Sequence, residues 1–170
     1  QRSTFKIQFL PDMKFFETDK PDVDPEENRV VLAEAESLLS DLEDGSVPLI
    51  IADPPYGINY HSNHHKGENP HDPVTNDWNF QIGPFLKECG RVLKDGGALY
   101  LFTRWDVYPL WARAVQPSGL ELKNCIAWMK NNHSAGDLEG NYGNKREEIM
   151  FCVKGRHKLR GHRWSNVWEF

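Results

Sequence analysis

The sequence predicts an α/β domain built on a mostly parallel β-sheet, with an antiparallel pair of strands at one edge. Three observations lead to this class: short apolar runs alternate with helical patterns, one run is apolar at successive positions, and two late strand candidates follow each other closely. The length of 170 residues suits one domain with a packed core. We expect residues 29–170 to form this domain. Residues 1–28, which include an acidic, proline-bearing stretch, are expected to precede it as an extension or linker.

In the first half of the chain, apolar runs predict strands and the segments between them predict helices. The run 29–33 is of the strand type, and 34–42 then favours a helix that Gly45 ends. The next strand, 47–52, is apolar at successive positions, which is typical of a strand buried on both faces. Residues 81–93 carry apolar side chains at helical spacing, which predicts a helix.

The second half of the chain continues the alternation and then departs from it. Residues 98–103 are expected to form a strand and 107–115 a helix. Two further strand candidates, 120–129 and 148–154, follow without a helical pattern between them. We expect these two strands to be the antiparallel pair at the edge of the sheet.

Two polar stretches, 57–79 and 131–145, each follow a predicted strand. Loops this long are usually functional or disordered, and open α/β sheets bind ligands beyond the carboxyl ends of their strands. We therefore expect both stretches near the functional site. The first contains histidines without cysteines, and we predict no metal site there because metal ligands normally need supporting partners. These residues are His61, His64, His65 and His71.

The net charge and the cysteine content indicate which partners and which cellular compartment the protein has. The net charge of −5 argues against a protein that coats nucleic acid passively, because phosphate binding relies on clustered cations. Few, widely spaced cysteines predict reduced thiols in a cytoplasmic protein, and no apolar run approaches the ~18 residues of a membrane span. One acid-free stretch nevertheless predicts a contact with DNA phosphates, with a solvated turn as the alternative. Its cations are Lys154, Arg156, Lys158, Arg160 and Arg163.

The series Asp53-Pro54-Pro55-Tyr56 directly follows the predicted buried strand. It places an acid, two residues without a backbone N–H donor and an aromatic ring where open α/β sheets bind ligands. A proline-rich turn with a capping Asp is the structural alternative.

The same series resembles the signature of DPPY-type DNA amino-methyltransferases, which methylate adenine N6 or cytosine N4. Later segments resemble the family as well, so the likeness extends from residue 29 to residue 170; they are 85–97, 126–130, 146–151 and 166–170. The resemblance implies a Rossmann-like methyltransferase sheet, S-adenosylmethionine as cofactor and double-stranded DNA as partner.

The resemblance also implies roles for individual residues of the series. The Asp53 carboxylate and the Pro54 carbonyl would accept hydrogen bonds from the amine, whose lone pair is otherwise delocalised into the base. Because proline fixes its φ angle, Pro54 and Pro55 hold these acceptors in place. Tyr56 would stack on a base that has been flipped out of the duplex.

For the cofactor, the resemblance points to Glu34 and Asp53. The family carries a Gly-Asp pair near the adenosyl group, where this sequence has Ala33-Glu34. A second interpretation of Glu34 is equally open, because an acid at the start of a helix is stabilised by the helix dipole.

The motif leaves several functions open, in order of preference. Adenine N6 is the preferred target because the series begins with Asp, whereas cytosine N4 enzymes often carry Ser there. Methylation of RNA or of a protein glutamine is disfavoured, because it uses an Asn-led motif. A different class of function is a catalytically inactive half-domain that binds DNA or a partner.

A glycine-rich cofactor loop is missing from the sequence. The family's form is Asp-x-Phe-x-Gly-x-Gly, and no glycine precedes Gly45. We therefore expect a permuted motif order and a partial domain with an incomplete sheet. The exposed edge of such a sheet predicts a homodimer or a missing segment as its cover.

Overall fold

The computed structural model describes residues 30–57, 80–133 and 139–169. Within these ranges, no helix has the length and apolar character required to cross a membrane. The elements are α1 (Ala35–Ser40), β1 (Val47–Ala52), α2 (Ile82–Val92), β2 (Leu93–Thr103), α3 (Tyr108–Val115), the 3-10 helix η2 (Gln116–Ser118), β3 (Glu121–Met129), β4 (Arg146–Val153) and β5 (Val167–Glu169).

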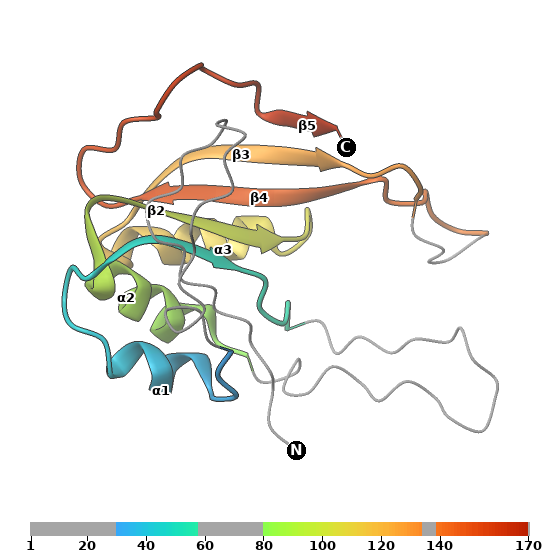
Figure 1. Cartoon of the computed structure of the whole chain (residues 1–170). Coiled ribbons are helices and arrows are strands. Elements are labelled where there is room, and N and C mark those ends of the chain that lie inside the picture. Colours follow the sequence, from blue (N-terminus) through green and yellow to red (C-terminus); the bar gives the residue numbers. More distant parts are fainter. Residues whose placement is uncertain (1–29, 58–79, 134–138, 170) are drawn as a thin grey trace.

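The five strands form one sheet in the order β1-β2-β4-β3-β5 (Figure 1). Strand β1 runs parallel to β2, and β3 runs parallel to β5. Strand β4 lies between β2 and β3 and is antiparallel to both. Four of the five strands thus run in the same direction and only β4 runs against them, which confirms the predicted α/β class and mostly parallel sheet. The antiparallel pair forms as well, but β5 lies outside it as the edge strand.

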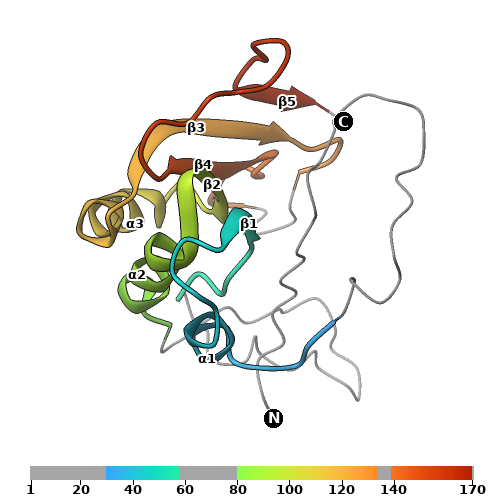
Figure 2. The ribbon, with the colours of Figure 1, turned by 60° about the vertical axis from the view of Figure 1, so that its left-hand side comes forward.

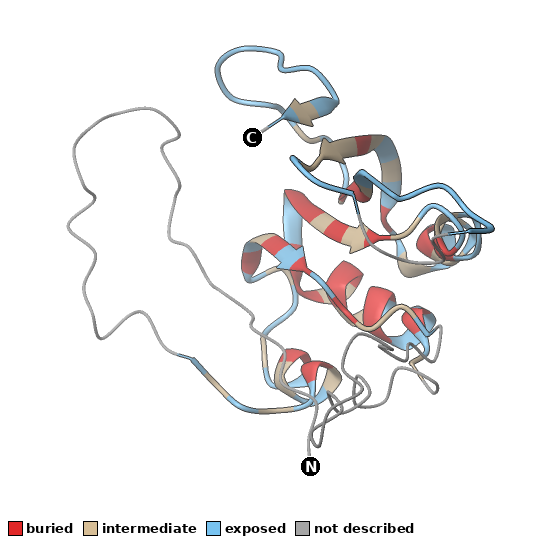
Figure 3. Ribbon diagram, turned by 90° about the vertical axis from the view of Figure 1, so that its right-hand side faces the viewer, coloured by how far each residue is buried: buried red, intermediate tan, exposed pale blue. Residues whose placement is uncertain are grey.

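The helices pack on one face of the sheet, as Figure 2 shows. Side chains of β2 alternate between two hydrophobic clusters, as the pleat of a strand requires. Leu99 and Leu101 join the cluster on the helical face, whereas Tyr100 and Phe102 point to the opposite face. Buried residues concentrate where the helices meet the sheet (Figure 3). This packing fixes β1 and β2, whose ends carry the candidate site.

The strand predicted for 29–33 is wrong for the residues that the structure describes. Residues 30–33 form no strand, and the side chains of Val30 and Leu32 are 82% and 62% exposed. An extended segment becomes a strand only when a neighbour accepts its backbone hydrogen bonds. Among the described residues, β1 pairs with β2 alone, so residues 30–33 do not extend the sheet.

A second difference concerns the start of β2, which precedes the predicted strand 98–103. Lys94-Asp95-Gly96-Gly97 ends the helix as expected but already belongs to the strand. Gly96 adopts a φ of +79°, a conformation that favours glycine, and its N–H donates to the Lys154 carbonyl at 2.7 Å. The glycine thereby allows the chain to turn from α2 directly into the sheet.

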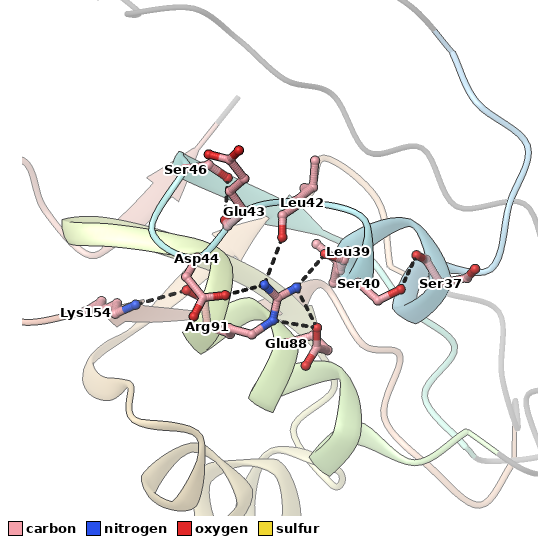
Figure 4. A network of polar contacts seen from close by, with 10 residues as sticks. All are labelled: Ser37, Leu39, Ser40, Leu42, Glu43, Asp44, Ser46, Glu88, Arg91 and Lys154. Carbon is pink, nitrogen blue, oxygen red and sulfur yellow. Dashed lines mark hydrogen bonds and ion pairs between the residues drawn. The ribbon is translucent and has the colours of Figure 1, made fainter.

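Arg91 connects the ends of several elements (Figure 4). Its guanidinium donates hydrogen bonds to the carbonyls of Leu39 and Leu42, each at 2.8 Å, and thus ties α2 to the end of α1 and to the turn that follows it. It also forms ion pairs with Asp44 at 2.6 Å and with Glu88 at 2.9 Å. These contacts fix the turn that leads into β1, and therefore the position of the strand that carries Asp53.

Candidate catalytic site

The series Asp53-Pro54-Pro55-Tyr56 lies at the carboxyl end of β1, next to the carboxyl end of β2. Ala52 pairs with Leu101 across the two parallel strands. The last residue of β2, Thr103, pairs with Glu148 near the start of β4. One end of the sheet therefore brings together the residues that follow β1, β2 and β3 and those that begin β4, as expected for a ligand site in such a sheet.

A hydrogen bond links the two functional groups of the series. The Tyr56 hydroxyl donates to Asp53 Oδ1 at 3.0 Å. Asp53 remains accessible at the surface, while Pro54 is buried and anchors the turn. The carboxylate is thus held in one orientation before any substrate is present.

The Tyr56 ring packs against an aromatic wall on the helical face. Its centroid lies 6.0 Å from that of Trp111 in an edge-to-face arrangement with an interplanar angle of 65°. Trp111 in turn lies 6.1 Å from Phe80 and is 3% exposed. Aromatic pairs of this geometry are favourable beyond their burial. Tyr56 is therefore fixed at both its hydroxyl and its ring.

Protein surroundings raise the pKa of the Asp53 carboxyl above its ordinary value. The largest cause is desolvation, the hydrogen bond from Tyr56 opposes it, and the negative charge of Glu147 adds to it. Desolvation also raises the pKa of Tyr56, and the neighbouring Asp53 charge raises it further. Tyr56 therefore stays protonated at neutral pH and remains a hydrogen-bond donor to Asp53.

Two ion pairs flank this end of the sheet. Lys130, after β3, contacts Glu147 of β4 at 2.6 Å. Arg104, after β2, forms two bonds to Asp106 at 2.9 and 3.0 Å. Glu147 acts on both Asp53 and Tyr56 through its charge, and Arg104 acts on Tyr56. Sequence reasoning assigned no role to these residues or to Trp111. Lys130 and Glu147 lie in the segments 126–130 and 146–151 that resemble the family, whereas Arg104 and Trp111 lie beside a predicted strand and on a predicted helix.

Glu34 is the N-cap residue of α1, and its side chain makes no capping hydrogen bond. It is exposed, and the start of α1 faces the same side as the end of β1 (Figure 1). The structure therefore places Glu34 at the start of a helix, as the dipole interpretation predicts, but without a side-chain capping hydrogen bond, and both interpretations of Glu34 stay open.

The predicted DNA-contacting cations do not lie beside Asp53. They lie in the segment that leaves the end of β4, which meets the start of β2 at the opposite end of the sheet, and that leads to the edge strand β5. Lys154 Nζ donates to the Arg91 carbonyl at 3.1 Å, so this cation has an internal partner. Most of the first polar stretch, including His61, His64, His65 and His71, lies outside the described residues.

A model of the family described as DNA methylase, which covers N6 and N4 methyltransferases, matches residues 47–169. The chain is 26% identical over 172 residues to the Type II methyltransferase M.HpaI of Haemophilus parainfluenzae, covering 85% of the chain and 51% of the relative. It is 29% identical over 134 residues to the DNA adenine methyltransferase YhdJ of Escherichia coli (strain K12), covering 76% of the chain and 42% of the relative.

Among solved structures, the chain resembles the PvuII DNA methyltransferase, which is cytosine-N4-specific. The TM-score is 0.58 at 12% identity, covering 81% of this chain and 55% of that one. The fold is therefore shared, and the chain spans about half the length of the curated relatives it matches.

Proposed function

The chain belongs to the DNA methylase family of N6 and N4 methyltransferases, and from this premise we propose that it methylates the exocyclic amine of a DNA base, with adenine N6 as the target. The observation that carries the proposal is the Asp53 carboxylate, which Tyr56 orients at the carboxyl end of β1. A carboxylate at this place is suited to accept a hydrogen bond from an amine.

The chemistry requires two acceptors because the amine of adenine or cytosine is a weak nucleophile. Asp53 accepts one amine hydrogen and the Pro54 carbonyl accepts the other, which favours a tetrahedral nitrogen with a localised lone pair. When the nitrogen–methyl bond forms, the sulfur–methyl bond of the donor would break and leave a neutral thioether, while the nitrogen becomes more acidic and releases one proton. The Asp53 carboxylate can accept that proton, and its raised pKa favours the transfer. Tyr56 offers its ring to the flipped base.

S-adenosylmethionine is the proposed cofactor, and when bound it supplies an electrophilic methyl group on a sulfonium. Glu34 fits a hydroxyl-bearing ligand, because its exposed carboxylate has no capping bond and starts α1 on the side where β1 ends. A carboxylate in such a place hydrogen-bonds ribose hydroxyls in other nucleotide-binding sheets. We assign Glu34 and Asp53 to cofactor binding on this basis.

Adenine is preferred over cytosine because the series begins with Asp53. The relative YhdJ is named a DNA adenine methyltransferase, whereas the PvuII enzyme of similar fold is cytosine-N4-specific. Both bases present an amino group, so the Asp53 geometry alone accepts either. Methylation of cytosine N4 is the alternative, and analysis of the methylated nucleoside by mass spectrometry distinguishes the two products.

The proposal is tested by transfer of a radiolabelled methyl group to duplex DNA. Asp53→Asn keeps the shape of the side chain but removes its charge and one acceptor. We expect transfer to fall by about a hundredfold to a thousandfold, in the range for removal of one preorganised transition-state contact. DNA binding, measured separately by fluorescence anisotropy, should remain within about twofold of the unmodified chain.

Glu121→Gln is the matched control. Its carboxylate is exposed at the start of β3, away from Asp53, and pairs only with Lys123 among the described residues. Equal transfer by the Asp53→Asn variant and the unmodified chain contradicts the proposal. DNA binding without transfer by any variant supports the inactive half-domain instead.

A further inference from the structure

The segment between β4 and β5, residues 154–166, contains no acidic residue. It runs from the end of β4, beside the start of β2, to β5 at the other end of the sheet (Figure 1). Four of its cations are exposed, within a chain whose net charge is −5. We call these four the basic segment: Arg156, Lys158, Arg160 and Arg163.

Hydrogen bonds to the sheet anchor both ends of the segment. Lys154 exchanges backbone hydrogen bonds with Gly96 and Gly97 at 2.7 and 3.0 Å, and the His157 ring nitrogen Nδ1 contacts the Gly96 carbonyl at 2.7 Å. At the other end, the Ala127 N–H donates to the Asn166 carbonyl at 2.8 Å. The cations between these anchors are therefore presented from a segment that the fold holds in place.

The four cations have no partner in the part of the chain that the structure describes. None forms an ion pair or a hydrogen bond with another described residue, whereas Arg91, Arg104 and Lys130 all do. An acidic protein offers many carboxylates for pairing, so four exposed cations without one are available to an external anion.

An exposed aromatic residue lies beside the cations. Trp164 is 64% exposed, and its ring centroid lies 5.5 Å from that of His162. A row of cations along one segment matches the regular row of phosphates on nucleic acid, and an exposed aromatic ring beside it adds contact area. This combination favours nucleic acid over a compact anion such as free phosphate.

We propose that the basic segment binds the phosphates of duplex DNA on one flank of the target base. The segment joins β4 to β5, whereas Asp53 follows β1 at the other edge of the strand order, so the four cations lie to one side of Asp53. The position relative to the target base rests on the proposed role of Asp53, but the phosphate contact does not.

The test compares two double variants that lose the same charges. Lys158→Gln with Arg160→Gln removes one lysine and one arginine from the basic segment. Lys87→Gln with Arg113→Gln removes the same types from exposed positions on α2 and α3. All four positions are exposed, so both variants should fold, and circular dichroism checks that they do.

Binding of a fluorescent duplex that contains a methylatable site is measured by anisotropy over a range of salt concentrations. Loss of two phosphate contacts should make the slope of log affinity against log salt shallower by roughly 2, and should lower affinity by about tenfold or more at low salt. The α2/α3 variant should keep the slope and affinity of the unmodified chain.

A second measurement tests the position of the phosphate contact relative to the target base. Duplexes are shortened to about three pairs on one side of the target base and then on the other. For the unmodified chain, shortening of one side should weaken binding, while shortening of the other should not. The Lys158/Arg160 variant should lose this asymmetry.

The outcomes test the phosphate contact, its position relative to the target base and the proposed function separately. An unchanged slope for the Lys158/Arg160 variant overturns the phosphate contact, and so does tighter binding to anionic vesicles or single-stranded RNA than to duplex. Symmetric dependence on the two flanks overturns the position on one flank. A changed slope in a chain that transfers no methyl group supports the phosphate contact and contradicts the proposed function.

Discussion

The Asp53–Tyr56 hydrogen bond and the nearby Glu147 act on the pKa of Asp53 in opposite directions. The Tyr56 hydroxyl stabilises the ionised carboxylate and so lowers the pKa, while the Glu147 charge destabilises it and so raises the pKa. Removal of the Tyr56 hydroxyl should therefore raise the pKa of Asp53, and removal of the Glu147 charge should lower it. The ionised carboxylate is the stronger acceptor and the only form that can take up the proton of the amine, so transfer should increase as pH rises through the pKa of Asp53.

This opposition predicts two shifts in the acid limb of the pH profile for methyl transfer. Tyr56→Phe removes the bond that lowers the pKa, so the acid limb should move to higher pH. Glu147→Gln removes the charge that raises the pKa, so the acid limb should move to lower pH. Initial rates at saturating DNA and S-adenosylmethionine measure both shifts. Movement of the two variants in the same direction excludes Asp53 as the titrating group.

At the scale of elements, helix α2 contains two glycines in contrasting surroundings. A Cβ atom at Gly90 would lie 2.0 Å from the backbone carbonyl oxygen of Ser118, because α2 and η2 approach closely there. A Cβ atom at Gly83 would meet nothing within 4 Å. The first glycine is required by packing, and the second only lowers the helix propensity of α2.

The contrast predicts stability changes of opposite sign from the same substitution. Gly90→Ala should lower the free energy of unfolding by about 1–3 kcal/mol, because backbone must move to admit the methyl group. Gly83→Ala should raise it by up to about 1 kcal/mol through reduced backbone entropy of the unfolded chain. Urea unfolding followed by circular dichroism measures both changes. A Gly90→Ala variant as stable as Gly83→Ala would show that α2 and η2 do not pack in this way.

Elements that depend on local pattern were predicted well. The helix predicted for 81–93 is α2 to within one residue at each end, because apolar spacing in a helix is a local property. The predicted strand 47–52 is β1 without change. The segment 29–33 has an equally suitable local sequence but forms no strand in its described residues, because a strand depends on distant pairing that the segment itself does not encode.

The residues of the candidate site also differ in whether the local sequence predicts them. Asp53 and Tyr56 lie three positions apart in one series, so the local sequence alone predicted both of them. Glu147 and Trp111 reach the site through the order of strands and the packing of α3, which no local pattern encodes. Lys154 illustrates what a local pattern leaves out. Its charge led to the prediction of a DNA contact, whereas the structure shows its ammonium donating a hydrogen bond to the Arg91 carbonyl.

At the scale of the whole molecule, β1 has an uncovered edge in the described part of the chain. It pairs with β2 on one side only, and its Ile51 is 43% exposed. Pro48 lacks a backbone N–H donor and is tolerated where a strand has no neighbour. Edges of this kind pair readily with another chain. We propose that either a second copy or a further segment of the protein covers this edge.

For the 170-residue chain alone, the edge predicts concentration-dependent association. Ile51→Lys should shift the chain towards monomer, because a charged lysine on an edge strand opposes strand pairing. Val30→Lys is the matched control, since Val30 is 82% exposed but lies outside the sheet. Sedimentation velocity measures both variants. An unmodified chain that stays monomeric at every concentration contradicts association through β1.

The Tyr56–Asp53 hydrogen bond also bears on which nucleobase the site accepts. The phenol donates to Oδ1, and because a carboxylate accepts several hydrogen bonds, a base that enters can donate its own bond beside that of the phenol. Adenine and cytosine present an amino group at the corresponding position and would supply that donor. Thymine and guanine present a carbonyl oxygen there, which would leave two acceptors facing each other without a proton between them. Under the proposed function, the oriented carboxylate would therefore discriminate against two of the four DNA bases before any methyl transfer.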